Sequence, residues 1–187
     1  MSEMSERNIE LGQEAENSAP LLTFNDTLKF SVKLLKKRDF SVHDMRQALM
    51  RAGHDENCIS EVIEHLLHLR YLDDERLAAN LLKKYTSRGK GPHYIEIEFA
   101  KRGLVFSMDA YRKFFDDQEI SSTDQIMGAI ERAGRKYLRQ NQSWYDFERK
   151  VLFYLFRQGL IREASEISLY KSSLRQLWNS KQIDGSN

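Results

Sequence analysis

The chain contains little cysteine and proline and has no long apolar run. Its one cysteine, Cys58, excludes an internal disulfide, as is typical of proteins in a reducing compartment such as the cytoplasm. Two prolines and nine glycines are too few for a β-sandwich or a collagen-like chain. No apolar segment approaches the roughly 18 residues of a transmembrane helix, and the N-terminal residues lack the apolar stretch of a signal peptide. We therefore expect a cytoplasmic protein without a membrane partner.

The net charge of +1 conceals an uneven distribution. Residues 1–26 contain six acidic residues against one basic residue, a net charge of −5, so the rest of the chain carries +6. The first residues also contain few apolar side chains that could join a core. We therefore predict an acidic, disordered tail over residues 1–24.

Most of the chain has the periodicity of amphipathic helices, which the segment 71–104 shows most clearly. Asp73 or Asp74 can cap a helix that carries apolar residues three or four positions apart. Gly89 and Gly91 interrupt this pattern, and Gly103 ends the helix that follows. The segment thus predicts two helices joined by a tight break.

Three glycines that end predicted helices recur along the chain, and we call Gly53, Gly103 and Gly159 the stop glycines. They are 50 and 56 residues apart, and the residues four and eight positions before each of them are apolar. The residue two positions before each stop glycine is basic. This self-similarity predicts an all-α protein of three tandem three-helix repeats. The predicted repeats span residues 25–72, 73–120 and 121–187, the last with a short C-terminal tail.

Polar residues precede the other predicted helices and suit N-caps. We expect caps at Asn25-Asp26-Thr27, at Ser41, at Asp55 or Asn57, and at Ser121–Asp124. The pairs Asp73–Asp74 and Asp116–Asp117 are also interpreted as caps rather than as catalytic carboxylates. No nucleophile–base pair and no phosphate-binding GxxxxGK[ST] loop is present. An enzyme is therefore the least favoured class, and no cofactor is predicted.

Charge alternates in blocks along the chain. Segment 29–51 has seven basic residues against two acidic ones, and segment 55–75 has seven acidic residues against one basic one. Segment 83–102 is again basic, 109–124 acidic and 132–150 basic. If the repeats stack in register, the basic helices form a band along one side of the molecule.

The basic residues beside the glycine break are the most informative group. Mobile cationic side chains and exposed amides at such a break can reach phosphates, and Tyr85 and Tyr94 could stack on a base. The alternative interpretation is a solvated helix face. The full set that we predict to contact a partner or DNA is Lys36, Lys37, Arg38, Arg46, Lys83, Lys84, Arg88, Lys90, Lys101, Arg102, Arg149 and Lys150.

Other candidates are weaker. His65 and His68 share a helix face and could hold a metal, but this spacing is common and no cysteine partner exists, so no metal site is predicted. Cys58 is expected to pack in the core, and Trp144 is expected to be partly exposed. The remaining aromatic residues at helical spacing are expected in the core: Phe114, Phe115, Phe153, Phe156 and Trp178.

Several of these motifs together resemble the RecX regulatory proteins. The resemblance covers roughly residues 28–160 and is most specific in the run Tyr71-Leu72-Asp73-Asp74-Glu75-Arg76 followed by Gly89-Lys90-Gly91-Pro92. Arg38-Asp39-Phe40-Ser41 and Lys101-Arg102-Gly103 contribute to it as well. One departure is Arg70, which stands where many relatives have glycine.

The resemblance implies three tandem three-helix repeats in an elongated, curved monomer. It further implies an intracellular bacterial protein that lies in the helical groove of the RecA–DNA filament. There it would restrain the ATPase, strand-exchange and coprotease activities of the RecA recombinase, with possible contacts to single- or double-stranded DNA. The alternative function is a helix-turn-helix DNA-binding protein that acts without RecA, because three-helix units with a basic second helix also fit that class. Few Asn or Gln side chains are placed to read base edges, which weakens this alternative.

Overall fold

The computed structural model describes residues 23–138 and 143–183, which form nine α-helices and one 3₁₀ helix without β-strands. Almost all of the predicted acidic tail lies outside the described residues. The helices are α1 (Phe24–Leu35), α2 (Val42–Arg51), α3 (Glu56–His68), α4 (Asp74–Ser87), α5 (Pro92–Ala100), α6 (Met108–Asp116), α7 (Ser122–Tyr137), α8 (Trp144–Gln158), η1 (Ala164–Tyr170) and α9 (Lys171–Ile183). The prediction of an all-α protein is confirmed.

Consecutive helices enclose three separate cores. Helices α1–α3 surround Met45, Leu49 and Ile59, each of which is fully buried. Helices α4–α6 surround a second core around Ile95, and helices α7–α9 a third around Phe147. We call these three units repeats 1, 2 and 3. The residue boundaries between them stay a prediction.

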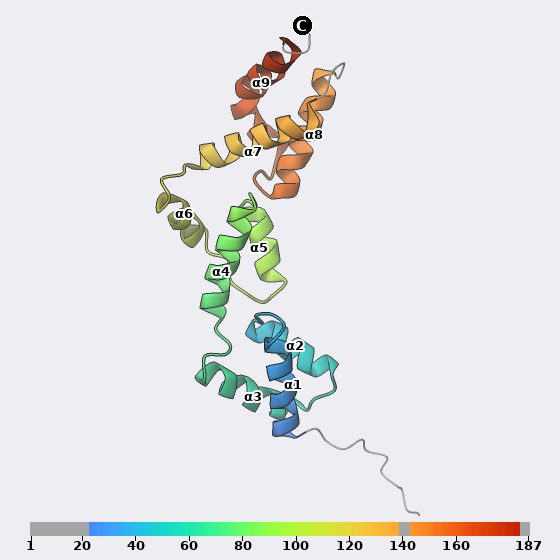
Figure 1. Cartoon of the computed structure of the whole chain (residues 1–187), viewed down its shortest axis with the longest axis vertical. Coiled ribbons are helices and arrows are strands. Elements are labelled where there is room, and N and C mark those ends of the chain that lie inside the picture. Colours follow the sequence, from blue (N-terminus) through green and yellow to red (C-terminus); the bar gives the residue numbers. More distant parts are fainter. Residues whose placement is uncertain (1–22, 139–142, 184–187) are drawn as a thin grey trace, which may run out of the picture.

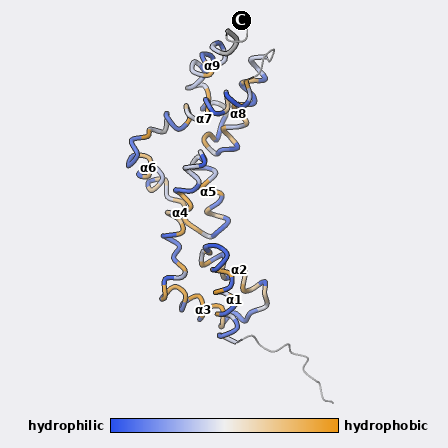
Figure 2. The backbone as a smooth tube through the Cα atoms, in the orientation of Figure 1, coloured by the Kyte–Doolittle hydropathy of each residue, from blue (hydrophilic) through white to orange (hydrophobic). Residues whose placement is uncertain are grey.

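The three units follow one another in an elongated array (Figure 1). Repeat 1 lies at one end and repeat 3 at the other, with repeat 2 between them. Hydrophobic and hydrophilic residues alternate along the helices (Figure 2), as expected when each helix buries one face. The array therefore has a long surface relative to its cores, and the order of the repeats fixes the order of the surface groups.

Most predicted helix caps are confirmed. Ser41, Asp55, Asp73 and Ser121 each accept a hydrogen bond from a backbone amide in the first turn of the following helix. The prediction for the first helix is wrong. Thr23 caps α1, and the predicted cap residues 25–27 lie inside the helix, because Thr23 and Asp26 form a reciprocal capping box.

Three further predictions need correction. Asp116 and Asp117 lie at the C-terminal end of α6 and therefore cap no helix N-terminus. Repeat 3 contains the 3₁₀ segment η1 in addition to α7, α8 and α9, whereas three helices were predicted for it. Gly91 does not end α4 either, because it is the N-cap of α5.

All three stop glycines adopt the left-handed conformation, with φ of 81° at Gly53, 66° at Gly103 and 71° at Gly159. Each ends the second helix of its repeat, as predicted. The third helices of repeats 1 and 2 end in the same conformation without glycine, at Arg70 (φ 55°) and Glu119 (φ 56°). Arg70 thus keeps the backbone form that a glycine would adopt more easily.

Candidate functional site

The second helices of the repeats, α2, α5 and α8, are stacked end to end, and we call this arrangement the column. The Ser41 hydroxyl at the start of α2 donates a 2.6 Å hydrogen bond to the carbonyl of Arg102 at the end of α5. The Gly91 amide at the start of α5 donates a 2.7 Å bond to the carbonyl of Gln158 at the end of α8. The N-termini of α2 and α5 thus contact the C-termini of α5 and α8, the second helices of the repeats that follow them.

The contact between α5 and α8 requires two glycines. A Cβ on Gly91 would lie 2.4 Å from the Gly159 carbonyl oxygen, and a Cβ on Gly159 would lie 2.2 Å from the Tyr94 nitrogen. A second backbone bond joins the His93 amide to the Gly159 carbonyl at 3.2 Å. The two backbones approach too closely for any side chain between them.

The contact between α2 and α5 is built from side chains instead. The Asp74 carboxylate at the start of α4 accepts a 2.9 Å bond from the Val42 amide. Asp44 forms ion pairs with Arg38 at 2.9 Å and with Arg102 at 3.4 Å. Ser41 is fully buried, and its hydroxyl also accepts a hydrogen bond from the Asp44 amide.

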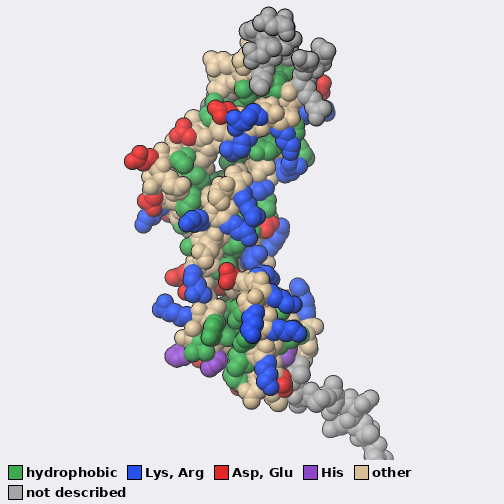
Figure 3. Space-filling view, in the orientation of Figure 1, with side chains coloured by type: hydrophobic (Ala, Val, Ile, Leu, Met, Phe, Trp, Pro, Cys, Tyr) green, Lys and Arg blue, Asp and Glu red, His purple; other side chains and the backbone are tan. Residues whose placement is uncertain are grey.

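Lysine and arginine side chains follow the column along much of the molecule's length (Figure 3). In this view they lie over α8, α5 and repeat 1, whereas acidic side chains gather over α6 at the other edge. A gathering of cations on one side of an array in this way attracts polyanions.

The predicted site residues divide into two classes. Five of them are held in ion pairs within the chain: Arg38, Arg46, Lys101, Arg102 and Arg149. The others form no ion pair with a described residue: Lys36, Lys37, Lys83, Lys84, Arg88, Lys90 and Lys150. The second class can neutralise phosphates without first breaking an internal pair.

Lys90 brings the basic residues of two repeats together. Its ammonium lies 4.0 Å from the centre of the Tyr94 ring. Burial, and then the charge of Arg157 in repeat 3, lower the pKa of Lys90. A negative charge bound beside Lys90 would favour its protonated form and offset both effects.

Tyr85 cannot stack on a base in the way that its position suggested. It is buried, and its hydroxyl donates a 3.4 Å hydrogen bond to Glu98. Burial accordingly raises the pKa of Tyr85. Tyr94 is half-buried with Lys90 over its ring, so an approaching base would first displace that lysine.

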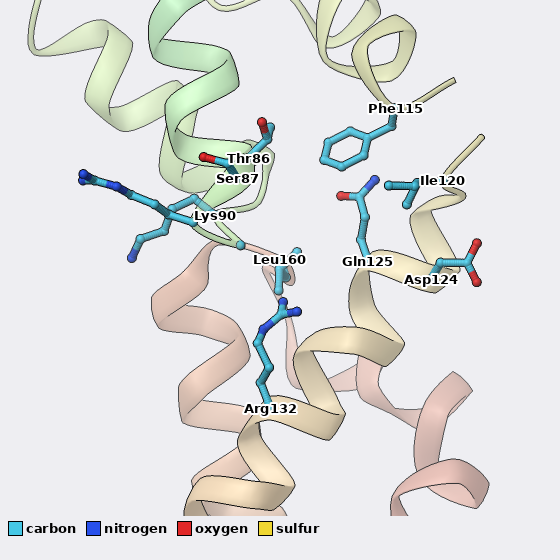
Figure 4. A pocket seen from close by; sticks show the side chains of 11 residues that line it. Thr86, Ser87, Lys90, Phe115, Ile120, Asp124, Gln125, Arg132 and Leu160 are labelled. Carbon is cyan, nitrogen blue, oxygen red and sulfur yellow. The ribbon is translucent and has the colours of Figure 1, made fainter. Parts of the chain in front are cut away.

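A cavity of about 330 Å³ lies between the α4–α5 turn and α7. The Arg132 side chain points into it toward the turn, where a Cβ on Gly89 would lie 3.0 Å from the guanidinium (Figure 4). Lys90 points away from the cavity, and Asp124 and the apolar Phe115 and Leu160 also line it (Figure 4). This mixture of groups does not form a cradle for an anion.

Sequence reasoning missed a set of exposed apolar side chains on the column. Phe153 is 66% exposed and Phe156 is 40% exposed, so the prediction that both lie in the core is wrong. Ile97 in repeat 2 occupies the position of Phe153, six residues before its stop glycine, and is 57% exposed. Met50, 50% exposed, occupies the position of Phe156 in repeat 1.

The pattern of α8 contains a signal that could have revealed these residues. Phe147, Val151 and Leu155 occupy one stripe at spacings of four and are fully buried. Phe153 lies two residues from Val151 and Leu155, about 200° around an ideal helix. An apolar residue on the face opposite the buried stripe is a candidate contact rather than a core residue. Phe153 lines a shallow cavity of about 290 Å³ with Tyr137, Arg149 and Lys150.

The other candidate positions lie in ordinary structural settings. Phe115 is buried as predicted, and Phe114 and Trp178 pack against the cores. Trp144 is partly buried against Trp178 with the Arg175 guanidinium over its ring. Cys58 is half-buried.

The described residues show neither a metal site at the histidine pair nor a membrane-spanning helix. His65 and His68 are both exposed, and the described residues contain no group of three or more metal-ligating side chains. No helix in the described ranges has the length and apolarity that crossing a bilayer requires.

Comparisons with known proteins point to one group of relatives. The regulatory protein RecX of Halorhodospira halophila is 30% identical over 120 residues, a match that covers 60% of this chain and 73% of that protein. The regulatory protein RecX of a Vibrio cholerae strain is 36% identical over 61 residues, which cover 33% of this chain and 40% of that one. The crystal structure of RecX from Lactobacillus salivarius has a TM-score of 0.60 at 16% identity, covers 82% of this chain and 97% of that one, and therefore shows a shared fold. No protein-family model matches the chain.

Proposed function

The chain belongs to the family of RecX regulatory proteins, and on this premise we propose that it binds the RecA recombinase assembled on DNA. Bound along the helical groove of the RecA–DNA filament, it restrains the ATPase, strand-exchange and coprotease activities of RecA. It acts in the cytoplasm as a regulator of DNA repair and recombination, including the SOS response, and performs no chemistry of its own.

The column and its positive surface carry this proposal. A row of cations along an elongated array complements a long polyanionic partner better than a compact basic patch would (Figure 3). The direct contacts within the column keep the cations of neighbouring repeats in fixed register. The free energy of binding is then not consumed in ordering the repeats.

The two kinds of exposed side chain on the column have separate roles in this proposal. The cations without an internal ion pair contact phosphates or acidic groups of the filament. Phe153 and Phe156 contact apolar surface of the protein partner, because exposed aromatic residues surrounded by basic residues are typical of protein interfaces. Ile97 and Met50 extend this contact toward repeat 1.

A titration of the DNA-dependent ATPase of RecA tests the proposal. We expect turnover to fall as the protein is added and the protein to co-sediment with assembled filaments. Electron microscopy of RecA on single-stranded DNA should show filaments that are shortened or decorated. Unchanged ATP turnover together with no binding to filaments would contradict the proposal.

A charge reversal identifies the residues involved. Replacing Lys83, Lys84, Arg88 and Lys90 by glutamate should weaken binding to filaments and leave the helical circular dichroism unchanged. Each lost phosphate contact on single-stranded DNA should reduce the slope of log affinity against log salt by roughly 0.7.

A matched pair of variants separates position from net charge. Lys83→Glu with Lys84→Glu on α4, and Arg112→Glu with Lys113→Glu on α6, change the net charge by the same amount. Only the α4 pair should weaken binding, because α6 carries the acidic edge of the molecule. Equal losses in the two variants would show that net charge, not this surface, drives binding.

The geometry disfavours the helix-turn-helix alternative. A recognition helix presents its N-terminal residues to the base edges of the major groove. Here the N-termini of α2 and α5 are buried in the column, where Ser41 and Gly91 contact the next repeat. Sequence-selective binding of duplex DNA without RecA would restore that alternative.

A further inference from the structure

The two contacts within the column follow one rule. The N-cap residue of a second helix donates a hydrogen bond to the carbonyl of the residue just before a stop glycine. Ser41 donates to Arg102, which precedes Gly103, and Gly91 donates to Gln158, which precedes Gly159. The residue two or three positions after the N-cap then covers the stop glycine, as His43 covers Gly103 and Tyr94 covers Gly159.

Repeat 1 has a receiving end of the same kind that nothing covers. Gly53 ends α2 with φ of 81°, in the conformation of the two stop glycines that are covered. A Cβ on Gly53 would meet no atom within 4 Å, whereas one on Gly103 would lie 2.6 Å from His43. Ala52, the residue that corresponds to Arg102 and Gln158, is exposed.

Repeat 3 has the complementary donating end. The start of α8, Ser143-Trp144-Tyr145-Asp146, matches the start of α2, Ser41-Val42-His43-Asp44, in its serine N-cap and in the aspartate that follows three residues later. The Ser143 hydroxyl donates to its own Asp146 at 2.7 Å, whereas the Ser41 hydroxyl donates across the contact between repeats. Tyr145, at the position of His43, is 70% exposed.

We propose that the start of α8 in one molecule docks on the Gly53 end of α2 in a second copy, so that the column continues from one molecule into the next. Ser143 then donates to the Ala52 carbonyl and Tyr145 covers Gly53. Arg51, next to Ala52, places a positive charge beside the receiving end, where Asp146 of the docked molecule would approach it. The occupant is a second copy because the molecule already builds this contact twice between its own repeats.

The two ends lie in the two terminal repeats of the array (Figure 1). A contact between different surfaces of identical molecules generates a ring if its rotation closes and an open chain if it does not, and ends that lie in the two terminal repeats of an elongated molecule favour the open chain. The contact is only as large as one helix end, which is far less than the area a stable dimer buries, so the protein is a monomer in dilute solution. Alignment on a common scaffold raises the effective concentration of the ends and favours the chain.

A disulfide trap tests this contact without RecA or DNA, so its outcome is separate from that of the proposed function. In a Cys58→Ser background, Ala52→Cys and Tyr145→Cys are mixed in a glutathione redox buffer, and the covalent products are resolved under non-reducing conditions. The mixed dimer should exceed that of Ala52→Cys with Lys113→Cys, an exposed α6 position, by at least about tenfold.

The double variant with both cysteines should form a ladder of covalent oligomers, because each molecule then carries both ends. Circular dichroism of every variant should match that of the parent. Equal yields in the test and control pairs would overturn the proposal. Tyr145→Cys homodimers in excess of the mixed dimer would overturn it as well, because they require a symmetric contact.

A final variant tests whether residues 1–22 of the same chain, rather than a second copy, occupy the Gly53 end of α2. α1 starts near the receiving end, since the Thr27 hydroxyl lies 2.8 Å from the His54 ring nitrogen, next to Gly53. Deleting residues 1–22 should leave the yield of mixed dimer unchanged or raise it. Loss of the mixed dimer after this deletion would overturn the proposal, because the product would then depend on the deleted segment.

Discussion

The contact between repeats 2 and 3 is made by backbone groups, whereas the contact between repeats 1 and 2 is made by side chains. In the former, two amides of α5 donate to the last carbonyls of α8, and Gly91 and Gly159 allow the close approach. In the latter, Ser41, Asp44 and Asp74 supply the polar groups. The two contacts occupy equivalent positions in the repeat but depend on different parts of the sequence.

This difference shows how one geometry can be maintained by unrelated residues. A backbone contact tolerates changes of surface charge but excludes any Cβ at the point of approach. A contact made by side chains leaves room for Cβ atoms but depends on the chemistry of each partner and on the salt concentration. The two contacts should therefore respond differently to the same kind of perturbation.

The largest effect is expected from a single methyl group in the backbone contact. Gly91 has φ of −88°, which alanine adopts easily, so Gly91→Ala adds only the clash with the Gly159 carbonyl, 2.4 Å away. We expect a loss of about 2–3 kcal/mol in the free energy of unfolding, measured by chemical denaturation. Gly53→Ala is the control, because it adds about 1 kcal/mol of backbone strain but no clash. Equal losses in the two variants would show that the close approach contributes nothing.

The next effect separates the helix cap from the contact between repeats. Ser41 and Ser143 both cap a helix, but only Ser41 also donates to another repeat. Ser41→Ala should cost about 2 kcal/mol of unfolding free energy and Ser143→Ala about 1 kcal/mol. If the two losses were equal, the Ser41–Arg102 bond would not stabilise the contact. Thermal or urea unfolding of the two variants measures the difference.

A smaller effect is expected from the ion pair between repeats 1 and 2. Arg102→Gln gives this contact the residue that Gln158 supplies in the other one, and it removes the charge that pairs with Asp44 at 3.4 Å. We expect a loss of at most about 1 kcal/mol at low salt that shrinks in 1 M salt. The difference between Arg102→Gln and the parent protein should be followed by urea unfolding at both salt concentrations. A loss independent of salt would argue for a packing role of Arg102 instead.

The smallest effect concerns pH at the backbone contact. Burial, and then the charge of Arg162, lower the pKa of His93, whose Nδ1 accepts a 2.7 Å bond from Arg162. The unfolded chain then binds this proton more readily than the folded one. The stabilisation is complete above the ordinary histidine pKa of about 6.5 and is lost as pH falls through the lower folded value.

Urea unfolding at pH 7.5 and pH 5 should therefore show a larger drop in stability for the parent protein than for His93→Asn, which keeps an acceptor but cannot titrate. The same drop in both proteins would place the pH dependence elsewhere in the molecule. The comparison needs no correction for net charge at pH 7.5, because a neutral histidine and asparagine carry the same charge.

Several features were predictable because their causes lie within a few residues. The stop glycines and the caps at Ser41 and Asp73 follow from short motifs whose energetics are local. The exception at Thr23 is instructive. Asp26 was predicted as part of a cap, but it supports the cap at Thr23 from inside the helix.

The candidate site was predictable only in part. Charge blocks in the sequence located the basic segments, but they did not reveal that Arg38 and Arg102, 64 positions apart, both pair with Asp44. Apolar spacing placed Phe153 and Phe156 in the core, because it did not distinguish the face of α8 that packs from the face that the structure leaves exposed. Only the structure therefore shows which cations and aromatic side chains are exposed and free of internal ion pairs, so that they can contact a partner.

The sequence alone determined where most of the helices begin and where α2, α5 and α8 end, since capping and left-handed glycines act within a turn of helix. Tertiary structure alone decided that α8, α5 and α2 meet end to end and that Gly53 remains uncovered. The physical reason is that a helix end carries unsatisfied amides or carbonyls whatever its surroundings. Which partner satisfies them depends on how whole repeats are placed in space.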